Sequence, residues 1–488
     1  EERIIAIYDP VSKSFNENPD FRNIQIDLKD GNWHTDLQEL KSLEDDKVVL
    51  SLRHWQSGIL YKVVKPEYDG DLEAFLNELE ELPFENIYLR WLPNMELGND
   101  SNPWGNRGEP YNDLLQSVHE ILVNNDSKIK LLWSPSGETG LMEYFPSFSY
   151  NGAGVDLNSS ALSLFRMRFN NKPLFIFSES TDFNLVEIKE RLDSIDFSVA
   201  NELISPENGN WQEELELGVY DLRNQHTGKE YVNIEHIFID FQEIREGTLG
   251  SKLSDIKGRS HIPFISIEPR NPENFDDPEV MNDILNGKYD RVISILYDQI
   301  DKLDSKVYLR FAHEMEIPIQ RYPWQSMHPE KYIKTYRYFM KSAIDKEFIK
   351  KIWGPAGDKS SMDYWPGEDY VDYISFAIYG LPDKNITDPK EQENFEKIYT
   401  RKSRRLHFLP KPFIIAEFGV KGADEFQELW MKEAANVIAD HKRIKAANYF
   451  NSQDVPDAWG DIDPPDWTIP SRIFDEFVNE LKKERHVE

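Results

Sequence analysis

Short apolar runs rich in Val, Ile, Phe and Tyr recur along the second half of the chain. Between them lie stretches whose apolar residues recur at helical spacing, such as 278–304 and 423–442. The runs predict buried strands and the stretches predict amphipathic helices. The predicted strands are 218–221, 236–241, 263–269, 307–314, 349–355, 373–380, 412–419 and 446–451. Eight strands with helical connections are typical of a parallel barrel of the TIM type, an α/β fold.

The first half of the chain shows a shorter version of the same pattern. Its predicted strands are 4–10, 24–28, 48–54, 87–93, 129–135, 173–180 and 197–204, with no clear run for the sixth strand. The segment 205–217 is the expected junction. We therefore predict two tandem (β/α)8 TIM-type barrels, in residues 1–210 and 211–488. A barrel of about 210 residues is near the lower limit for this fold, so its loops leave little material for an active site.

The two halves also share a sequence pattern, because Arg310 and its surroundings repeat Arg90 and its surroundings 220 residues later. The matched pairs are Arg90 and Arg310, Met95 and Met315, Glu96 and Glu316, Trp104 and Trp324, Trp133 and Trp353, Pro135 and Pro355, Gly137 and Gly357, and Tyr144 and Tyr364. Chance would not keep so many Trp, Pro, Gly and Met residues in one register, which indicates a duplicated domain.

Composition narrows the function further. The net charge of −32 argues against nucleic acid, because phosphate binding needs a basic face. It does not oppose a neutral polysaccharide. The chain has no cysteine, and no metal-ligand or phosphate-loop motif, so we expect neither metal nor cofactor. No apolar run approaches the roughly 20 residues of a membrane span. We expect a secreted, periplasmic or cell-surface protein whose signal segment is absent from this chain.

Two carboxylates lie at predicted strand ends in the second half. Glu314 ends the fourth strand and Glu417 lies at the end of the seventh. The C-terminal ends of barrel strands face the active site, and glycoside hydrolysis needs two carboxyl groups that flank the glycosidic bond. The structural alternative is that both are rim carboxylates that hold Arg310 or another cation. The pair together favours the catalytic interpretation.

The residues RFAHEME with a downstream YPW, then FAIYG and IAEFG, resemble glycoside hydrolase family 26, which is best known for β-mannanases. The resemblance covers most of 218–488. It implies that Glu314 is the general acid/base and Glu417 the nucleophile of a retaining mechanism. It also implies substrate-binding roles for the neighbouring residues His313, Tyr379, Trp324 and Trp467, with Tyr379 hydrogen-bonded to the nucleophile. One departure is Glu316, where the family usually has Asn or Thr. A carboxylate there would alter the subsite beside the cleaved bond.

The neighbouring residues also have structural interpretations. His313 could be a satisfied core residue and Tyr379 a packing residue. Trp324 and Trp467 follow prolines in predicted loops, where an exposed indole could stack on a sugar, or they could pack in the core. Glu268, at the end of the third strand, is a further substrate-binding candidate or a member of a rim ion pair.

The first half lacks both catalytic positions. Asn94 falls where the second half has Glu314. Counting from the shared prolines, Ser178 falls on Glu417, with Glu179 beside it on the opposite face. We therefore interpret residues 1–210 as a non-catalytic barrel. It either supports the second barrel or binds glycan through aromatic side chains, namely Trp91, Trp104, Trp55 and His54.

Two functions remain open from the sequence. The first is a retaining endo-β-glycosidase that hydrolyses a β-linked polysaccharide, of the β-mannan or mixed-linkage β-glucan type, in the C-terminal barrel. The second is a non-hydrolytic carbohydrate-binding accessory protein of polysaccharide synthesis or export. The pair Glu314 and Glu417 favours the first. The first half without this pair, together with Glu316, keeps the second open.

Overall fold

The structure is a computed structural model of the chain, which divides into two compact units, Glu1–Ser205 and Pro206–Glu488. The division falls five residues before the predicted boundary. The described residues of the first unit are 2–9, 14–16, 21–28, 37–38, 40–43, 47–54, 69–98, 104–105, 108–138, 140–146, 148–156, 172–178 and 185–193. Those of the second unit are 215–317, 321–382, 393–407, 409–455 and 463–484.

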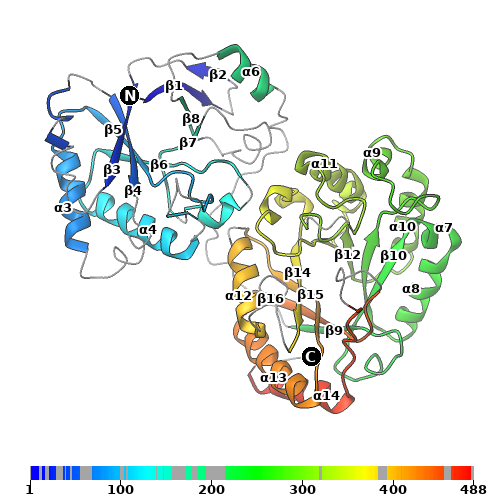
Figure 1. Cartoon of the computed structure of the whole chain (residues 1–488). Helices are drawn as coiled ribbons and strands as arrows, with labels where there is room; N and C mark the ends of the chain where they lie inside the picture. Colours follow the sequence, from blue (N-terminus) through cyan, green and yellow to red (C-terminus); the bar gives the residue numbers. More distant parts are fainter. Residues whose placement is uncertain are drawn as a thin grey trace. The chain divides into compact units, whose positions relative to one another are not determined.

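The second unit is a closed barrel of eight parallel strands, β9 to β16, in which β16 pairs with β9 (Figure 1). The strands are β9 (Glu216–Tyr220), β10 (Ile234–Asp240), β11 (Ile262–Glu268), β12 (Val307–Phe311), β13 (Ile349–Trp353), β14 (Tyr373–Gly380), β15 (Phe413–Val420) and β16 (Ile444–Phe450). Each overlaps a predicted strand, so the prediction of a parallel (β/α)8 barrel is confirmed for this unit.

Helices connect the strands of the second unit and cover the barrel. They are α7 (Phe241–Glu246), α8 (Thr248–Gly258), α9 (Val280–Leu285), α10 (Asp290–Asp301), α11 (Pro329–Met340), α12 (Phe395–Leu406), α13 (Asp424–Asp440) and α14 (Ser471–Glu484), with short 3-10 turns η4 (Lys341–Ala343), η5 (Ser361–Tyr364) and η6 (Glu368–Tyr370). The predicted helix 278–304 is two helices, because Gly287 between them has a left-handed φ of 78°. Inside the barrel, side chains from seven strands form one apolar cluster that includes Phe264, Tyr308 and Ile414.

The first unit differs from a full parallel barrel in the part that the structure describes. Its strands are β1 (Glu2–Asp9), β2 (Ser14–Asn16), β3 (Phe21–Leu28), β4 (Lys47–His54), β5 (Asn86–Trp91), β6 (Ile129–Trp133), β7 (Gly152–Asp156) and β8 (Leu174–Ser178). Its helices are α3 (Asp69–Glu80), α4 (Gly108–Asn124), α6 (Leu185–Asp193) and the 3-10 turn η2 (Leu141–Tyr144). Strands β3 to β8 are parallel, whereas β1 runs antiparallel to both β3 and β8.

The antiparallel β1 has a physical reason. A parallel connection needs a crossover of about a dozen residues or more, usually a helix. Residues 10–20, between β1 and β3, instead contain β2, which pairs back on β1. The prediction of two full barrels is therefore not confirmed, and the predicted strand 197–204 lies outside the described residues.

Strand β7 is the sixth strand that the apolar pattern does not show. Its sequence, GAGVD, has two glycines on the sheet face that carries the Phe175 and Phe177 rings of β8. A Cβ at Gly152 would come within 2.8 Å of the Phe175 ring, and one at Gly154 within 2.5 Å of the Phe177 ring. The two phenylalanines belong to the apolar cluster of the unit. Glycine therefore makes room for aromatic rings from the neighbouring strand.

The contacts after β5 and β12 recur 220 residues apart. The backbone N–H of Asn94 donates to Ser134 O, and that of Glu314 donates to Gly354 O, both at 2.8 Å. The Trp104 indole donates to the carbonyl of residue 93 at 2.9 Å, and the Trp324 indole to that of residue 313 at 2.7 Å. The sequence repeat therefore corresponds to a repeated local structure.

Gly154→Ala tests the packing of β7 on β8. The new methyl group would overlap the Phe177 ring, and such overpacking costs about 1–3 kcal/mol. We expect faster amide hydrogen exchange in peptides from β7 and β8, measured by mass spectrometry. Gly228→Ala is the matched control, because a Cβ at Gly228 meets nothing within 4 Å. Unchanged exchange in Gly154→Ala would contradict the packing argument.

Candidate active site

Glu314 follows β12 on a sharply bent backbone. Ala312 and Glu314 have left-handed φ values of 47° and 55°, which non-glycine residues adopt only when their surroundings hold them there. The hydrogen bond from the Glu314 N–H to Gly354 O fixes the bend. Leu92 and Asn94 of the first unit have the same conformation, with φ values of 41° and 57°. The bend therefore belongs to this strand end, and the second unit places a half-buried carboxylate on it.

Both oxygens of the Glu417 carboxylate have a partner. Arg310 on β12 donates from Nη2 to Oε1 at 2.5 Å, and Tyr379 on β14 donates from its hydroxyl to Oε2 at 2.8 Å. Glu417 and Arg310 are both buried. The hydrogen bond expected between Tyr379 and Glu417 is confirmed. The ion pair of the structural alternative is also present, and it compensates the carboxylate charge in a buried position.

The Arg310 side chain is itself held in place. Its Nε donates to Ser266 Oγ at 2.7 Å, and Ser266 Oγ lies 2.8 Å from Nε2 of the buried His236. Burial first, and the Arg310 charge second, hold the pKa of His236 well below its usual range, so its ring is neutral. A Cβ at Gly354 would lie 2.7 Å from Arg310 Cδ, so glycine is needed beside the guanidinium.

Glu314 has the proton affinity of an acid that works near neutral pH. Burial, and then the charge of Glu417, raise the pKa of Glu314 to about 7, against the smaller opposing charges of Lys402 and Arg310. A carboxyl group with this pKa can donate a proton in one step and accept one in the next. The neighbouring carboxyl group, Glu417, has Arg310 as its ion-pair partner.

Of the remaining candidates, His313 is buried and Glu268 is half-buried. His313 is 3% exposed and packs among the rings of Phe238, Tyr322 and Trp324. Burial and the Arg310 charge hold its pKa well below the usual value. Glu268 forms the ion pair of its structural alternative, with Arg270 Nε 3.4 Å from its Oε2. Burial raises the pKa of Glu268 despite this cation.

The prediction that Trp324 and Trp467 are exposed stacking platforms is wrong. Both side chains are 0% exposed. The Trp324 ring stacks on Tyr322 at a centroid distance of 4.5 Å, and its N–H donates a hydrogen bond to the carbonyl oxygen of His313. Trp467 packs against Tyr379 at 4.6 Å, behind the hydroxyl that holds Glu417. A loop position in the sequence does not reveal which side chains cover the indole.

The prediction that Glu316 alters a substrate subsite is also wrong. Its Oε1 accepts hydrogen bonds from the backbone N–H groups of Gly357 and Asp358 and from the Ser361 hydroxyl. Glu316 is 4% exposed, so it holds the loop after β13 from below the surface. Glu96 does the same in the first unit, with Ser136, Gly137 and Glu138 as donors. The repeat of this glutamate in both halves was the sequence signal for a structural role.

Sequence reasoning missed the residues that reach the site from distant segments. His236 and Ser266 support Arg310 from β10 and β11. The Lys402 side chain extends from α12 to β14, and its ammonium group donates to the carbonyl oxygen of Ala377 at 2.7 Å. No local motif marks these residues, although His236 occupies an inward position of an alternating strand pattern.

In the first unit, Asn94 stands where the second unit has Glu314, and it belongs to a cluster of polar side chains. Asp156 on β7 accepts from Arg90 Nη2 at 2.9 Å and from the Asn94 amide at 3.0 Å. Burial acts to raise the pKa of Asp156, but Arg90 and Asn94 outweigh it and the pKa is lowered. The Phe177 ring centre lies 4.3 Å from the Arg90 guanidinium carbon. The Asp156 carboxylate is therefore already paired.

Two of the four aromatic residues proposed for glycan binding in the first unit are buried. Trp91 and Trp104 are buried, at 4% and 0% exposure, which contradicts a stacking role. Trp55, Glu179 and the side chains of His54 and Ser178 lie outside the described residues.

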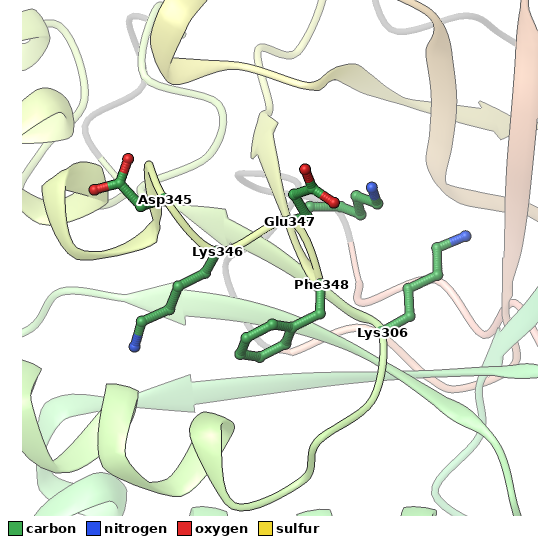
Figure 2. Close-up of a pocket in the computed structure, with 6 residues that line it drawn as sticks. Lys306, Asp345, Lys346, Glu347 and Phe348 are labelled. Atoms are coloured by element: carbon green, nitrogen blue, oxygen red, sulfur yellow. The ribbon is translucent and has the colours of Figure 1, made fainter.

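A separate hollow of about 650 Å³ lies at the N-terminal ends of β12 and β13, the ends away from Glu314 (Figure 2). Its lining residues are Lys306, Asp345, Lys346, Glu347, Phe348 and Lys350. They precede or begin β12 and β13, whereas Glu314 follows β12. Lys306 is paired with Glu216 and Lys346 with Asp301, so these cations are already compensated. The candidate chemistry belongs to the other end of the barrel.

Two further properties concern only the part of the chain that the structure describes. Within it, no group of His, Asp and Glu side chains could hold a metal ion. No helix there is long and apolar enough to cross a membrane.

Comparisons with known proteins find relatives among polysaccharide-degrading enzymes. No protein-family model matches the chain. The chain is 27% identical over 183 residues to Endoglucanase H of Acetivibrio thermocellus, a match that covers 35% of this chain and 20% of that protein. It is 26% identical over 115 residues to the β-1,3-xylanase TXYA of a Vibrio species, covering 22% and 24%. The chain thus spans less than a quarter of these relatives.

Solved structures with a similar backbone include a GH26 β-mannanase from Bacteroides ovatus. It has 14% identity and a TM-score of 0.41, and the match covers 56% of this chain and 89% of that one. A second is the endo-β-mannanase/endo-β-glucanase of Prevotella bryantii, with 11% identity, a TM-score of 0.37 and coverage of 96% and 92%.

Glu316→Gln and Glu316→Ala test the structural role of this residue. The amide keeps an acceptor oxygen for the three donors, so we expect near-normal stability. Alanine leaves buried donors without a partner at about 1–3 kcal/mol each, so we expect a loss of about 3 kcal/mol in urea unfolding. Glu96→Ala should destabilise the first unit similarly. Equal stability of the two Glu316 variants would contradict the assignment.

Proposed function

We propose that the second unit is a retaining endo-β-glycosidase that hydrolyses a β-linked polysaccharide and is related to glycoside hydrolase family 26. The observation that carries the proposal is the Glu417 carboxylate, held by Arg310 and Tyr379 beside an acid, Glu314, of pKa about 7. The similarity to an endoglucanase and a β-1,3-xylanase supports the same reaction class. The two carboxyl groups then have the roles that retention of configuration requires.

In the first step, Glu417 attacks the anomeric carbon while Glu314 protonates the departing glycosidic oxygen. The covalent glycosyl–enzyme ester neutralises Glu417, and Glu314 becomes a carboxylate. In the second step, Glu314 takes a proton from water, which attacks the same carbon and releases Glu417. Arg310 and Tyr379 fix the direction of the Glu417 carboxylate throughout, so that one oxygen faces each donor.

The substrate is proposed as a β-mannan or a mixed-linkage β-glucan. The similarity to an endoglucanase and to a β-1,3-xylanase adds a further β-glucan, tested as cellulose, and β-1,3-xylan, so a reducing-sugar assay over these four polymers is the direct test. If none is hydrolysed but one is bound, the accessory-protein alternative is favoured instead.

The first unit is proposed to be a duplicated copy that does not catalyse and that supports the second. Its described mouth has the Arg90–Asp156–Asn94 cluster in place of an acid and a nucleophile. We also propose that the protein acts outside the cytoplasm, where polysaccharides of this class are met.

Glu417→Ala is expected to abolish hydrolysis of every substrate, because no covalent intermediate can form. Glu314→Ala should lose about 10²–10⁴-fold on polysaccharide but far less on aryl glycosides, whose good leaving groups need no acid. Initial rates on both substrate classes measure the difference. Asp345→Asn, in the hollow at the other end of the barrel, is the control and should keep the normal rate. Normal rates in both glutamate variants would sink the assignment.

The pH dependence follows from Glu314. The acid must be protonated in the free enzyme, so kcat/KM on polysaccharide should fall as the pH rises through about 7. On an aryl glycoside with a good leaving group this alkaline fall should be weaker. Rates measured from pH 4 to 9 on both substrates test the prediction, which a flat profile between pH 6 and 8 would contradict.

A further inference from the structure

The side chains inside the second barrel form three layers along the barrel axis. On β10, Ile234, His236 and Phe238 point to the same face and belong to successive layers. The first layer is the apolar cluster already described, and the second holds the hydrogen bonds of His236, Ser266 and Arg310. The third layer, at the C-terminal ends of the strands, is largely aromatic. Its members are Tyr220, Phe238, Tyr379, Leu381, Phe450 and Trp467.

The third layer lies directly on the ion pair that holds the nucleophile candidate. The centre of the Phe238 ring is 5.6 Å from the guanidinium carbon of Arg310 and 4.5 Å from the His236 ring. The hydroxyl of Tyr379, another member of the layer, donates to Glu417 Oε2 at 2.8 Å. Both partners of the Glu417 carboxylate thus contact or belong to the layer. A molecule that reaches Glu417 therefore lies beside these rings.

The rings of the third layer are in contact with one another and are only partly covered. Tyr220 stacks on Phe450 at a centroid distance of 4.6 Å, and it meets the Phe238 ring at right angles, at 5.2 Å and 87°. Tyr220, Phe238 and Tyr379 are half-buried, whereas the rings of the first layer are buried. The mouth of the barrel thus leaves apolar surface in water, and a ligand that covers this surface gains hydrophobic free energy.

The first unit has no ring at the position of Phe238. Gln25 is the register partner of Ser51, as Phe238 is of Ser266, and both serines are register partners of the arginine of the repeat. The polar contact beneath is retained, because Ser51 Oγ donates to Asn23 Oδ1 at 2.7 Å. The unit without the pair of carboxylates therefore keeps a polar second layer and has glutamine in the third. The Phe238 ring belongs to the unit that has the pair.

We infer that the Tyr220 and Phe238 rings form a platform that binds the sugar whose anomeric carbon Glu417 attacks. This role rests on the proposed function and adds to it the surface that holds this sugar during both steps. A pyranose has an apolar C–H face, and aromatic rings supply a large apolar area for it. The attacked carbon must come within about 3–3.5 Å of the carboxylate, so the rest of the sugar lies along the third layer. The stacking role predicted for the buried Trp324 and Trp467 thus passes to half-buried rings.

Tyr220→Ala and Phe238→Gln, which installs the residue of the first unit, test the platform through binding. Both are made in Glu314→Gln, which lacks the acid, and are titrated by calorimetry with hexasaccharides of β-mannan, mixed-linkage β-glucan, cellulose and β-1,3-xylan. We expect Kd to rise about tenfold or more in each, because part of the apolar contact of an aromatic ring is lost. Tyr220→Phe keeps the ring and should bind like the parent. Phe348→Leu, which changes a half-buried ring at the other end of the barrel, is the control and should leave Kd unchanged.

Urea unfolding checks that each variant folds. Phe238→Leu retains an apolar side chain over Arg310 without the ring, and it replaces Phe238→Gln if that variant does not fold. Unchanged Kd in the folded Tyr220→Ala and Phe238 variants would overturn the inference, as would an equal loss in Tyr220→Phe and Tyr220→Ala.

The binding measurement also separates the platform from the proposed reaction. Hydrolysis by the native chain with unchanged affinities in the variants would overturn the platform alone. Weaker binding by Tyr220→Ala, without hydrolysis of any polymer by the native chain, would support the platform and contradict the reaction. Absence of both binding and hydrolysis would contradict both.

Discussion

The buried ion pair between Arg310 and Glu417 is the interaction on which the rest of the site depends. A carboxylate and a guanidinium removed from water lose several kcal/mol of solvation each, and only good geometry and further hydrogen bonds compensate that loss. The chain supplies them through Ser266, Tyr379 and the space left by Gly354. Truncating either Arg310 or Glu417 would leave a buried charge without its partner, which costs more than the pair itself contributes.

The same ion pair gives the carboxyl groups of Glu314 and Glu417 different electrostatic environments. Glu417 has a cation of its own, whereas Glu314 is half-buried and is acted on by the charge of Glu417. Burial and the charge of Glu417 raise the pKa of Glu314, as the role of a general acid requires. The first unit shows the opposite solution. There the arginine is neutralised by Asp156 from a different strand, and an amide stands where the acid would be.

The sequence predicted the second barrel well because its strands are continuous apolar runs, separated by stretches whose apolar residues recur at helical spacing. It failed at β7, where glycines replace the apolar side chains that mark a strand, and at β1, whose direction depends on the length of a connection. At the site, Glu314, Glu417 and Tyr379 come from strand ends, which a linear pattern locates. The environments of Trp324, Trp467 and Lys402 depend on contacts between distant segments, which no local pattern encodes. The structural role of Glu316 could have been inferred from the sequence, because Glu96 occupies the matching position of the first half.

The antiparallel strand β1 has a consequence for how the first unit could change. Replacing Asn94 with glutamate would add a negative charge beside Asp156, which already has Arg90 as its ion-pair partner. A nucleophile would additionally have to emerge from β8, whose edge is held by the hydrogen bonds to β1. A facing pair of carboxylates in this unit would thus require more than one replacement. The pairing of β1 with β8 therefore limits how this unit could acquire such a pair of carboxylates.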